Sequence, residues 1–166
     1  ERIQSEIKGK GKGAELIDLQ LAAAPHFAQA TGEVYGLSIV LSDWQLPIDF
    51  SIHSLEWQEG SVTALLSTYH GTEIALELDK LSPLHGSLRA KPVSDDPWAS
   101  IWTEGETRFQ SGEIRGEFNS SMIALHANLQ GVYAYGFEVD TLFTRLKIDT
   151  AGLLFWDSRL IRDDIR

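Results

Sequence analysis

The alternation of apolar and polar residues is clearest in residues 46–64, and it predicts a strand. Ile48, Phe50 and Ile52 are separated by single polar residues. This period of two is typical of a strand that buries one face and exposes the other. We therefore take this stretch as the element around which the rest of the fold is organised.

The alternation changes parity after Ile52, because the next apolar residues, Leu55 and Trp57, occupy odd positions. One extra residue near His53–Ser54, a β-bulge, would return both side chains to the original face. Residues 58–61 read Gln-Glu-Gly-Ser, which is typical of a hairpin turn. The stretch thus predicts a bulged strand, a tight turn and a second strand that begins at Val62.

Similar strand signals recur along the chain at intervals that favour antiparallel hairpins over βαβ units. The predicted strands cover residues 34–41, 48–57, 62–69, 73–78, 84–90, 106–109, 113–118, 122–129, 135–143, 145–149 and 153–156. We expect a mainly β protein of about ten strands with at most one or two short helices, one of them at 97–102. The strands would form an antiparallel curled sheet, either an open β-groove or a β-sandwich.

The chain of 166 residues is expected to form one β domain over residues 14–166. Residues 91–98, an irregular segment with two prolines, separate two strand-rich halves of that domain. Residues 1–13 end in alternating glycine and lysine, a composition that favours a flexible basic arm.

The net charge of −10 excludes some partners. Residues 1–13 hold four basic and two acidic residues, which leaves ten basic and 22 acidic residues for the remainder. The remainder is acidic enough to repel phosphate backbones, and we expect no nucleic-acid partner. It also repels anionic lipid surfaces, which could be contacted only through the basic N-terminal arm. No apolar run approaches 18 residues, and no cysteine is present to form a disulfide or a thiolate metal site.

No catalytic signature is visible, and we expect neither enzymatic activity nor a cofactor or metal. The adjacent carboxylates at 95–96 and 163–164 point apart in a strand and are better explained as loop and surface residues. No two histidines have the spacing of a local metal site, although a zinc site assembled from distant strands stays open. The histidines are His26, His53, His70, His85 and His126.

Five tryptophans and seven phenylalanines provide a large apolar surface with two interpretations. They could fill the sealed core of a β-sandwich or a closed barrel. Alternatively, one face of a long curled sheet stays open, because every second side chain of every strand points into the same trough. The alternation alone leaves both interpretations open.

The segment LPIDFSIHSLEWQEGSV, residues 46–62, resembles segments of the AsmA-like bacterial envelope proteins of the TamB and YdbH types. These carry a Leu-Pro start, an alternating strand, a closing Leu-x-Trp or Leu-x-Leu and a glycine turn. Residues 152–160 have a related pattern. The succession of short strands and turns along the whole chain also resembles that of the short periplasmic N component of type II secretion machines. The resemblance covers about 20 residues well, and we expect any membrane anchor of the kind with which such proteins begin to lie in flanking segments.

The resemblance implies a non-enzymatic periplasmic protein of the cell envelope, associated with the inner membrane in its full-length context through flanking segments. It implies an apolar concave sheet that binds or transfers phospholipid or another apolar ligand, or helps assemble an envelope machine with protein partners. A structural or protein-interaction module with a sealed core, such as a secretion-system component, and a glycan-active β-sandwich are the alternatives. The expected lining residues are Ile48, Phe50, Ile52, Leu55 and Trp57, with Leu76 and Leu78 as additions.

Overall fold

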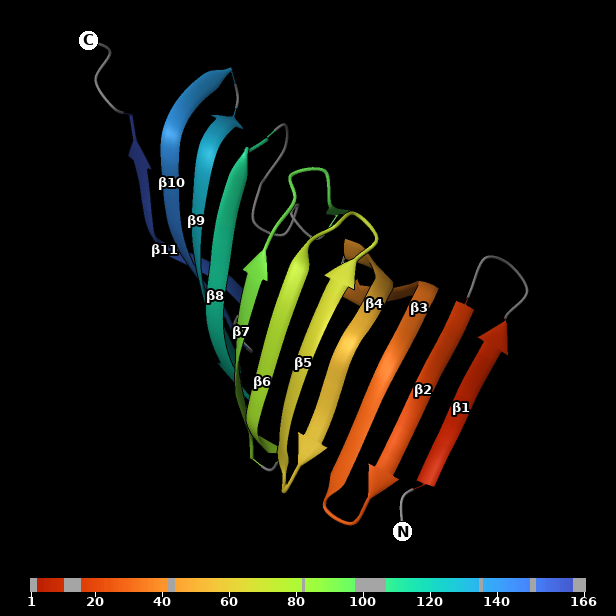
Figure 1. Ribbon diagram of the computed structural model, residues 1–166. Coiled ribbons are helices and arrows are strands. Elements are labelled where there is room, and N and C mark those ends of the chain that lie inside the picture. Colours follow the sequence, from red (N-terminus) through yellow and green to blue (C-terminus); the bar gives the residue numbers. More distant parts are fainter. Residues whose placement is uncertain are drawn as a thin grey trace.

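The computed structural model is a single antiparallel sheet whose eleven strands lie side by side in the order of the sequence (Figure 1). It describes residues 3–10, 16–41, 44–81, 83–97, 107–134, 136–149 and 152–162. The strands are β1 (Ile3–Lys10), β2 (Leu16–Ala24), β3 (Phe27–Leu41), β4 (Trp44–Gln58), β5 (Ser61–Thr68), β6 (Glu73–Leu81), β7 (Leu84–Lys91), β8 (Ser111–Asn119), β9 (Met122–Ala134), β10 (Phe137–Asp149) and β11 (Gly152–Ile161).

This architecture confirms the prediction of a mainly β, antiparallel protein. Among the described residues each strand contacts only its neighbours in the sheet, so that no second layer packs on either face. Of the two predicted arrangements, the structure is therefore the open sheet and not the sandwich. The described residues contain no α-helix, and most of the predicted helical turn, residues 98–102, lies outside them.

Within the stretch that we expected to be a flexible arm, residues 1–13, residues 3–10 form the strand β1. This strand pairs with β2 in unbroken register, from Ile3 opposite Ala23 to Lys10 opposite Leu16. Ile7 lies opposite Leu19, so that the first strand extends the apolar pattern of the second. Glycine and lysine have low strand propensity in isolation, but pairing with a long neighbouring strand outweighs that preference.

The predicted bulge and hairpin of the 46–64 segment are confirmed. Between β4 and β5 the register passes from Ile52 opposite Leu66 to Ser54 opposite Leu65, which leaves His53 as the extra residue. At the following turn Glu59 and Gly60 have φ of 50° and 93°. Two central residues with positive φ define the turn type whose twist matches that of the flanking strands.

The two faces of the sheet differ in polarity from β2 to β10. The apolar face carries a cross-strand row in which the partners follow one another from β2 to β10 without a charged residue. The row comprises Leu21, Ala30, Leu55, Ala64, Leu76, Leu88, Gly116, Leu125 and Leu146. The polar face carries the alternate positions, which include most of the charged side chains of the strands.

The sheet curls, and β8–β11 turn away from the plane formed by β1–β6 (Figure 1). Ile114, Leu125 and Leu146 on the apolar face pack into one cluster and are 1–4% exposed. In the described residues no second layer covers them, so that burial of this degree indicates curvature toward the apolar face. We therefore take the apolar face as the inner, concave side of the curled sheet.

The connector between β7 and β8 is attached to the β5–β6 turn by buried hydrogen bonds. The Thr68 hydroxyl donates to the Asp96 carboxylate, and the backbone amide of Thr72 donates to the Thr68 hydroxyl at 3.0 Å. Thr72 in turn accepts from the amide of Val93 at 3.0 Å through its own hydroxyl. Thr68, Thr72 and Asp96 are buried, so that each hydrogen bond replaces contact with water.

We expect Thr68→Val to lower the free energy of unfolding by about 1–3 kcal/mol, because it leaves buried polar groups without one of their partners. The substitution preserves the shape and β-branching of the side chain. Thr63→Val is the matched control, because Thr63 is an exposed position of the same strand. Urea denaturation of both variants measures the difference. Equal stability of the two would show that these hydrogen bonds do not hold the connector.

Candidate functional site

The candidate residues of β4 lie on one face because of the bulge at His53. Phe50 and Ile52 precede the extra residue, and Leu55 and Trp57 follow it. Through β5 their respective partners are Thr68, Leu66, Ala64 and Val62, which are successive alternate positions of one strand. All four β4 side chains are half-buried.

The remaining candidates are placed as follows. Leu78 lies opposite Val62, and Leu76 lies opposite Ala64, so that both continue the rows of Trp57 and Leu55 on the apolar face. Both are half-buried. Ile48 pairs with Leu37 of β3 through the backbone, but its side chain lies outside the described residues.

The apolar face extends further than the predicted candidates, across β7 to β10. Leu88, Ile114, Ile123 and Leu146 all belong to its main cluster. A second cluster adds Phe109, which reaches this face from the segment before β8 and packs with Leu129, Val132, Val139 and Leu142. Period-two alternation in residues 113–148 was the signal that could have located most of this surface.

A glycine makes room for the large side chains of this extended region. A Cβ atom at Gly116 would lie 2.0 Å from Leu125 Cδ2, so that the leucine occupies the space above the glycine backbone. Leu125 is consequently only 4% exposed. Small and large residues therefore alternate across the strands, which fills this part of the concave face.

The burial of the apolar face changes from one half of the sheet to the other. On β8–β10 its side chains are nearly sealed, with Leu129 at 0% and Ile114 at 1% exposure. On β4–β6 the large side chains of this face are half-buried, although the smaller Ala64 and Thr68 of β5 are buried, and no described element packs over this part of the face. The large side chains over β4–β6 are thus more exposed than those of Leu129 and Ile114 on β8–β10.

Among the side chains that the structure describes on this face, three hydroxyl groups are hydrogen-bonded. The hydroxyl groups of Thr144 and Ser158 form a hydrogen bond of 2.9 Å between β10 and β11. Thr68 is bonded to Asp96, as described above. Because these groups are already hydrogen-bonded, the face offers a ligand apolar contact rather than hydrogen bonds.

The described residues provide no cluster of three or more metal-ligating side chains. Two histidines make local contacts: His53 Nε2 lies 2.8 Å from Ser67 Oγ, and His85 Nδ1 lies 3.1 Å from Asp79 Oδ2. Both histidines are exposed. These contacts are compatible with surface roles.

No family model, curated protein or solved structure matches the chain. In the part of the chain that the structure describes, no helix is long and apolar enough to cross a membrane. Function must therefore be inferred from the surfaces of the sheet itself.

Proposed function

We propose that the chain binds phospholipid through its acyl chains and that the open part of the apolar face, over β4–β6, is the binding surface. The observation that carries this proposal is the half-buried state of Phe50, Ile52, Leu66 and Leu76 on a face over which no described element packs. Contiguous apolar surface without cover is typical of a binding site. No catalysis is proposed.

The dimensions of the face suit acyl chains. The alternate positions of β5 from Val62 to Thr68 span about 20 Å, because a strand rises about 3.3 Å per residue. A bilayer has a hydrocarbon core about 30 Å thick, so that the acyl chains of one leaflet extend about 15 Å. Acyl chains could therefore lie along the strands, and eleven strands spaced about 4.8 Å apart give the sheet a width of about 50 Å.

The energetics favour exchange of lipid over permanent capture. Each buried methylene group contributes about 0.8 kcal/mol relative to water. A lipid that comes from a membrane leaves one hydrocarbon environment for another of similar polarity. The net free energy of moving its acyl chains from the membrane to the protein is therefore small. A passive apolar surface of this kind is suited to the transfer of lipid.

We extend the proposal to the bacterial envelope, with the periplasm as the compartment. This extension rests on the resemblance of residues 46–62 to the AsmA-like proteins, whose sheets are curled, open and apolar on the inside. The open curled sheet described here agrees with that expectation. The negative net charge of −10 further favours uncharged or zwitterionic lipid surfaces over anionic ones.

A second candidate function is that of an interaction module in an envelope machine. In the described residues β1 pairs only with β2, and β11 pairs only with β10. The outer edges of these strands therefore present backbone groups that a strand of a partner could extend. This function requires no lipid on the apolar face.

The proposal is tested by native mass spectrometry of the protein purified from bacterial cells. We expect masses that exceed that of the chain by bound phospholipid, and uptake of a fluorescent phosphatidylcholine from zwitterionic vesicles after delipidation. Folded protein that carries no phospholipid and takes up none would contradict lipid binding. That result, together with a stable complex with an envelope protein, would favour the interaction module.

A further inference from the structure

The polar face of the sheet carries a row of basic residues across four strands, β7 to β10, and the row ends at an aspartate on β11. Arg89 of β7 lies opposite Arg115 of β8, which lies opposite His126 of β9. His126 lies opposite Arg145 of β10, and Arg145 lies opposite Asp157 of β11. Like charges on directly opposite residues destabilise a sheet, so that such a row requires compensation.

Two carboxylates provide that compensation, and each is shared by two arginines. Glu113 accepts from Nε of Arg89 and from Nε of Arg115, the latter at 2.8 Å. Asp157 Oδ1 lies 3.2 Å from Nε of Arg159, and Asp157 Oδ2 lies 3.7 Å from Nη1 of Arg145. Each group of two arginines and one carboxylate therefore retains one positive charge.

The carboxylates lie beneath the guanidinium groups. Their side chains are 27% and 29% exposed, whereas those of the four arginines are 51–72% exposed. The hydrogen bond from Arg115, reinforced by Arg89, lowers the pKa of Glu113 and keeps this residue charged at neutral pH. The carboxylates thus orient the arginines, whose largely exposed guanidinium groups each carry five N–H donors.

A depression with a volume of about 450 Å³ lies among these residues. A volume of this order is typical of sites for small organic molecules. Its lining combines basic and apolar side chains, since Phe143 is 40% and Ile161 is 43% exposed. Among the lining residues are Arg115, His126, Phe143, Arg145, Arg159 and Ile161.

We propose that this depression binds an organic phosphate, with the phosphate on the arginines and the organic part against Phe143 and Ile161. Arg115, Arg145 and Arg159 line the depression with Glu113 and Asp157, and Arg89 is bonded to Glu113 from beside it. The four arginines and two carboxylates leave two positive charges in and beside the depression, and a phosphomonoester carries about −1.5 to −2 at pH 7. A carboxylate would neutralise only one of these charges. The planar forks of arginine also match phosphate oxygens in pairs.

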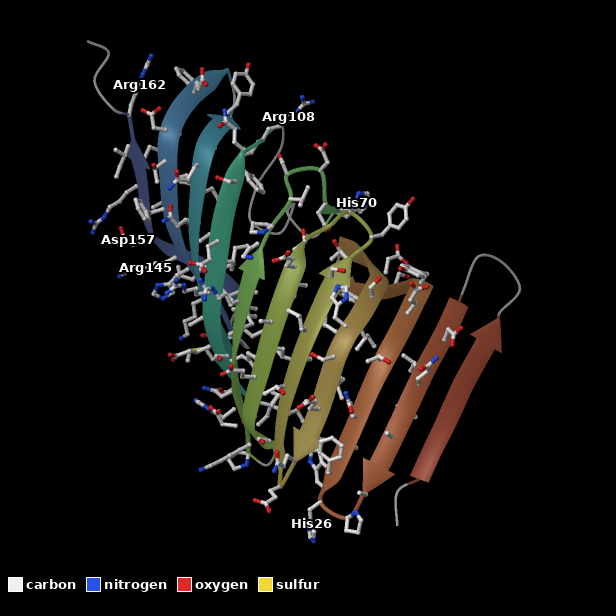
Figure 2. All side chains as sticks on the ribbon, in the orientation of Figure 1. His26, His70, Arg108, Arg145, Asp157 and Arg162 are labelled. Carbon is white, nitrogen blue, oxygen red and sulfur yellow. The ribbon has the colours of Figure 1, made fainter. Side chains whose placement is uncertain are left out.

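This site is separate from the proposed lipid surface. Arg145 and Asp157 lie on the outer side of the curled sheet, away from its concave face (Figure 2). Arg145 directly precedes Leu146, which belongs to the apolar cluster, so that the two side chains point to opposite faces. Asp157 lies opposite Arg145. The inference therefore does not depend on lipid binding, and either proposal can fail without the other.

Titration calorimetry with phenyl phosphate, inorganic phosphate and benzoate at low salt tests this site. We expect phenyl phosphate to bind more tightly than the other two and to lose affinity as sodium chloride is added. Arg115→Gln and Arg145→Gln should each weaken phenyl phosphate about tenfold, because each removes charge-assisted hydrogen bonds. Arg108→Gln is the matched control, because Arg108 is also exposed and lies far from Arg145 (Figure 2).

Circular dichroism of each variant establishes that the sheet is retained, and Arg145→Lys provides a second variant that preserves the charge but not the fork. Absence of phenyl phosphate binding to the wild-type protein would overturn the proposal, as would unchanged affinity in both glutamine variants. Inorganic phosphate bound as tightly as phenyl phosphate would overturn the role of Phe143 and Ile161.

Discussion

Replacing Leu66 by aspartate is expected to remove bound phospholipid, whereas Leu65→Asp is expected to leave lipid binding intact. The two leucines are adjacent in β5 and point to opposite faces. Leu66 lies opposite Ile52 and Ile74 on the apolar face, and Leu65 is 45% exposed on the polar face. A charge on the apolar face would have to be desolvated by each acyl chain that lies across it.

The measurement is native mass spectrometry of both variants purified in parallel, with circular dichroism to establish folding. Because Leu66 is only half-buried, we expect the Leu66→Asp sheet to stay folded. Two results would contradict the lipid proposal: a folded Leu66→Asp protein with normal lipid content, or lipid loss of equal extent in both variants. Unfolding of Leu66→Asp alone would favour a sealed apolar face.

The second large effect is expected for stability, at the closed end of the apolar face. Leu146→Ala should lower the free energy of unfolding by about 2–5 kcal/mol, because it removes buried methyl groups and leaves a cavity. Leu146 is 1% exposed and packs among Ile114, Leu125 and Ala127. Leu154→Ala, at a 57% exposed position on the next strand, is expected to change stability by less than about 0.5 kcal/mol.

Urea denaturation of the two variants, with equal m-values required for comparison, measures this difference. A small effect at Leu146 would mean that the burial on β8–β10 does not stabilise the fold. It would also remove the distinction between a closed half and an open half of the apolar face.

The sequence allowed the local structure of β4 and β5 to be predicted in detail. The change of parity between Ile52 and Leu55 located the bulge, and Glu59-Gly60 located the turn, because both signals depend only on neighbouring residues. The same local alternation placed Leu76 and Leu78 on the face of Leu55 and Trp57. Period-two patterns report reliably which side chains share a face when strands pair in sequence order.

Other features depend on pairing between distant residues and escaped prediction. The first strand was missed because its glycines and lysines have weak propensity, and its stability derives from pairing with β2. The basic row on the polar face was missed because Arg89 and Arg145 are 56 positions apart in the sequence. Only the combined register of three strand pairs, β7–β8, β8–β9 and β9–β10, places them on the same line across the sheet.

The strict neighbour-to-neighbour order of the strands has a consequence for how this protein folds and varies. Each hairpin closes a short loop, so that the sheet can grow by successive additions without waiting for distant segments to meet. Its free energy of unfolding should be close to the sum of the interaction free energies between neighbouring strands, as in a linear array of repeats. Insertion or deletion of one hairpin would then lengthen or shorten the sheet by about 10 Å while the remaining pairs keep their register. The width of the concave surface is in this sense an adjustable quantity, set by the number of hairpins.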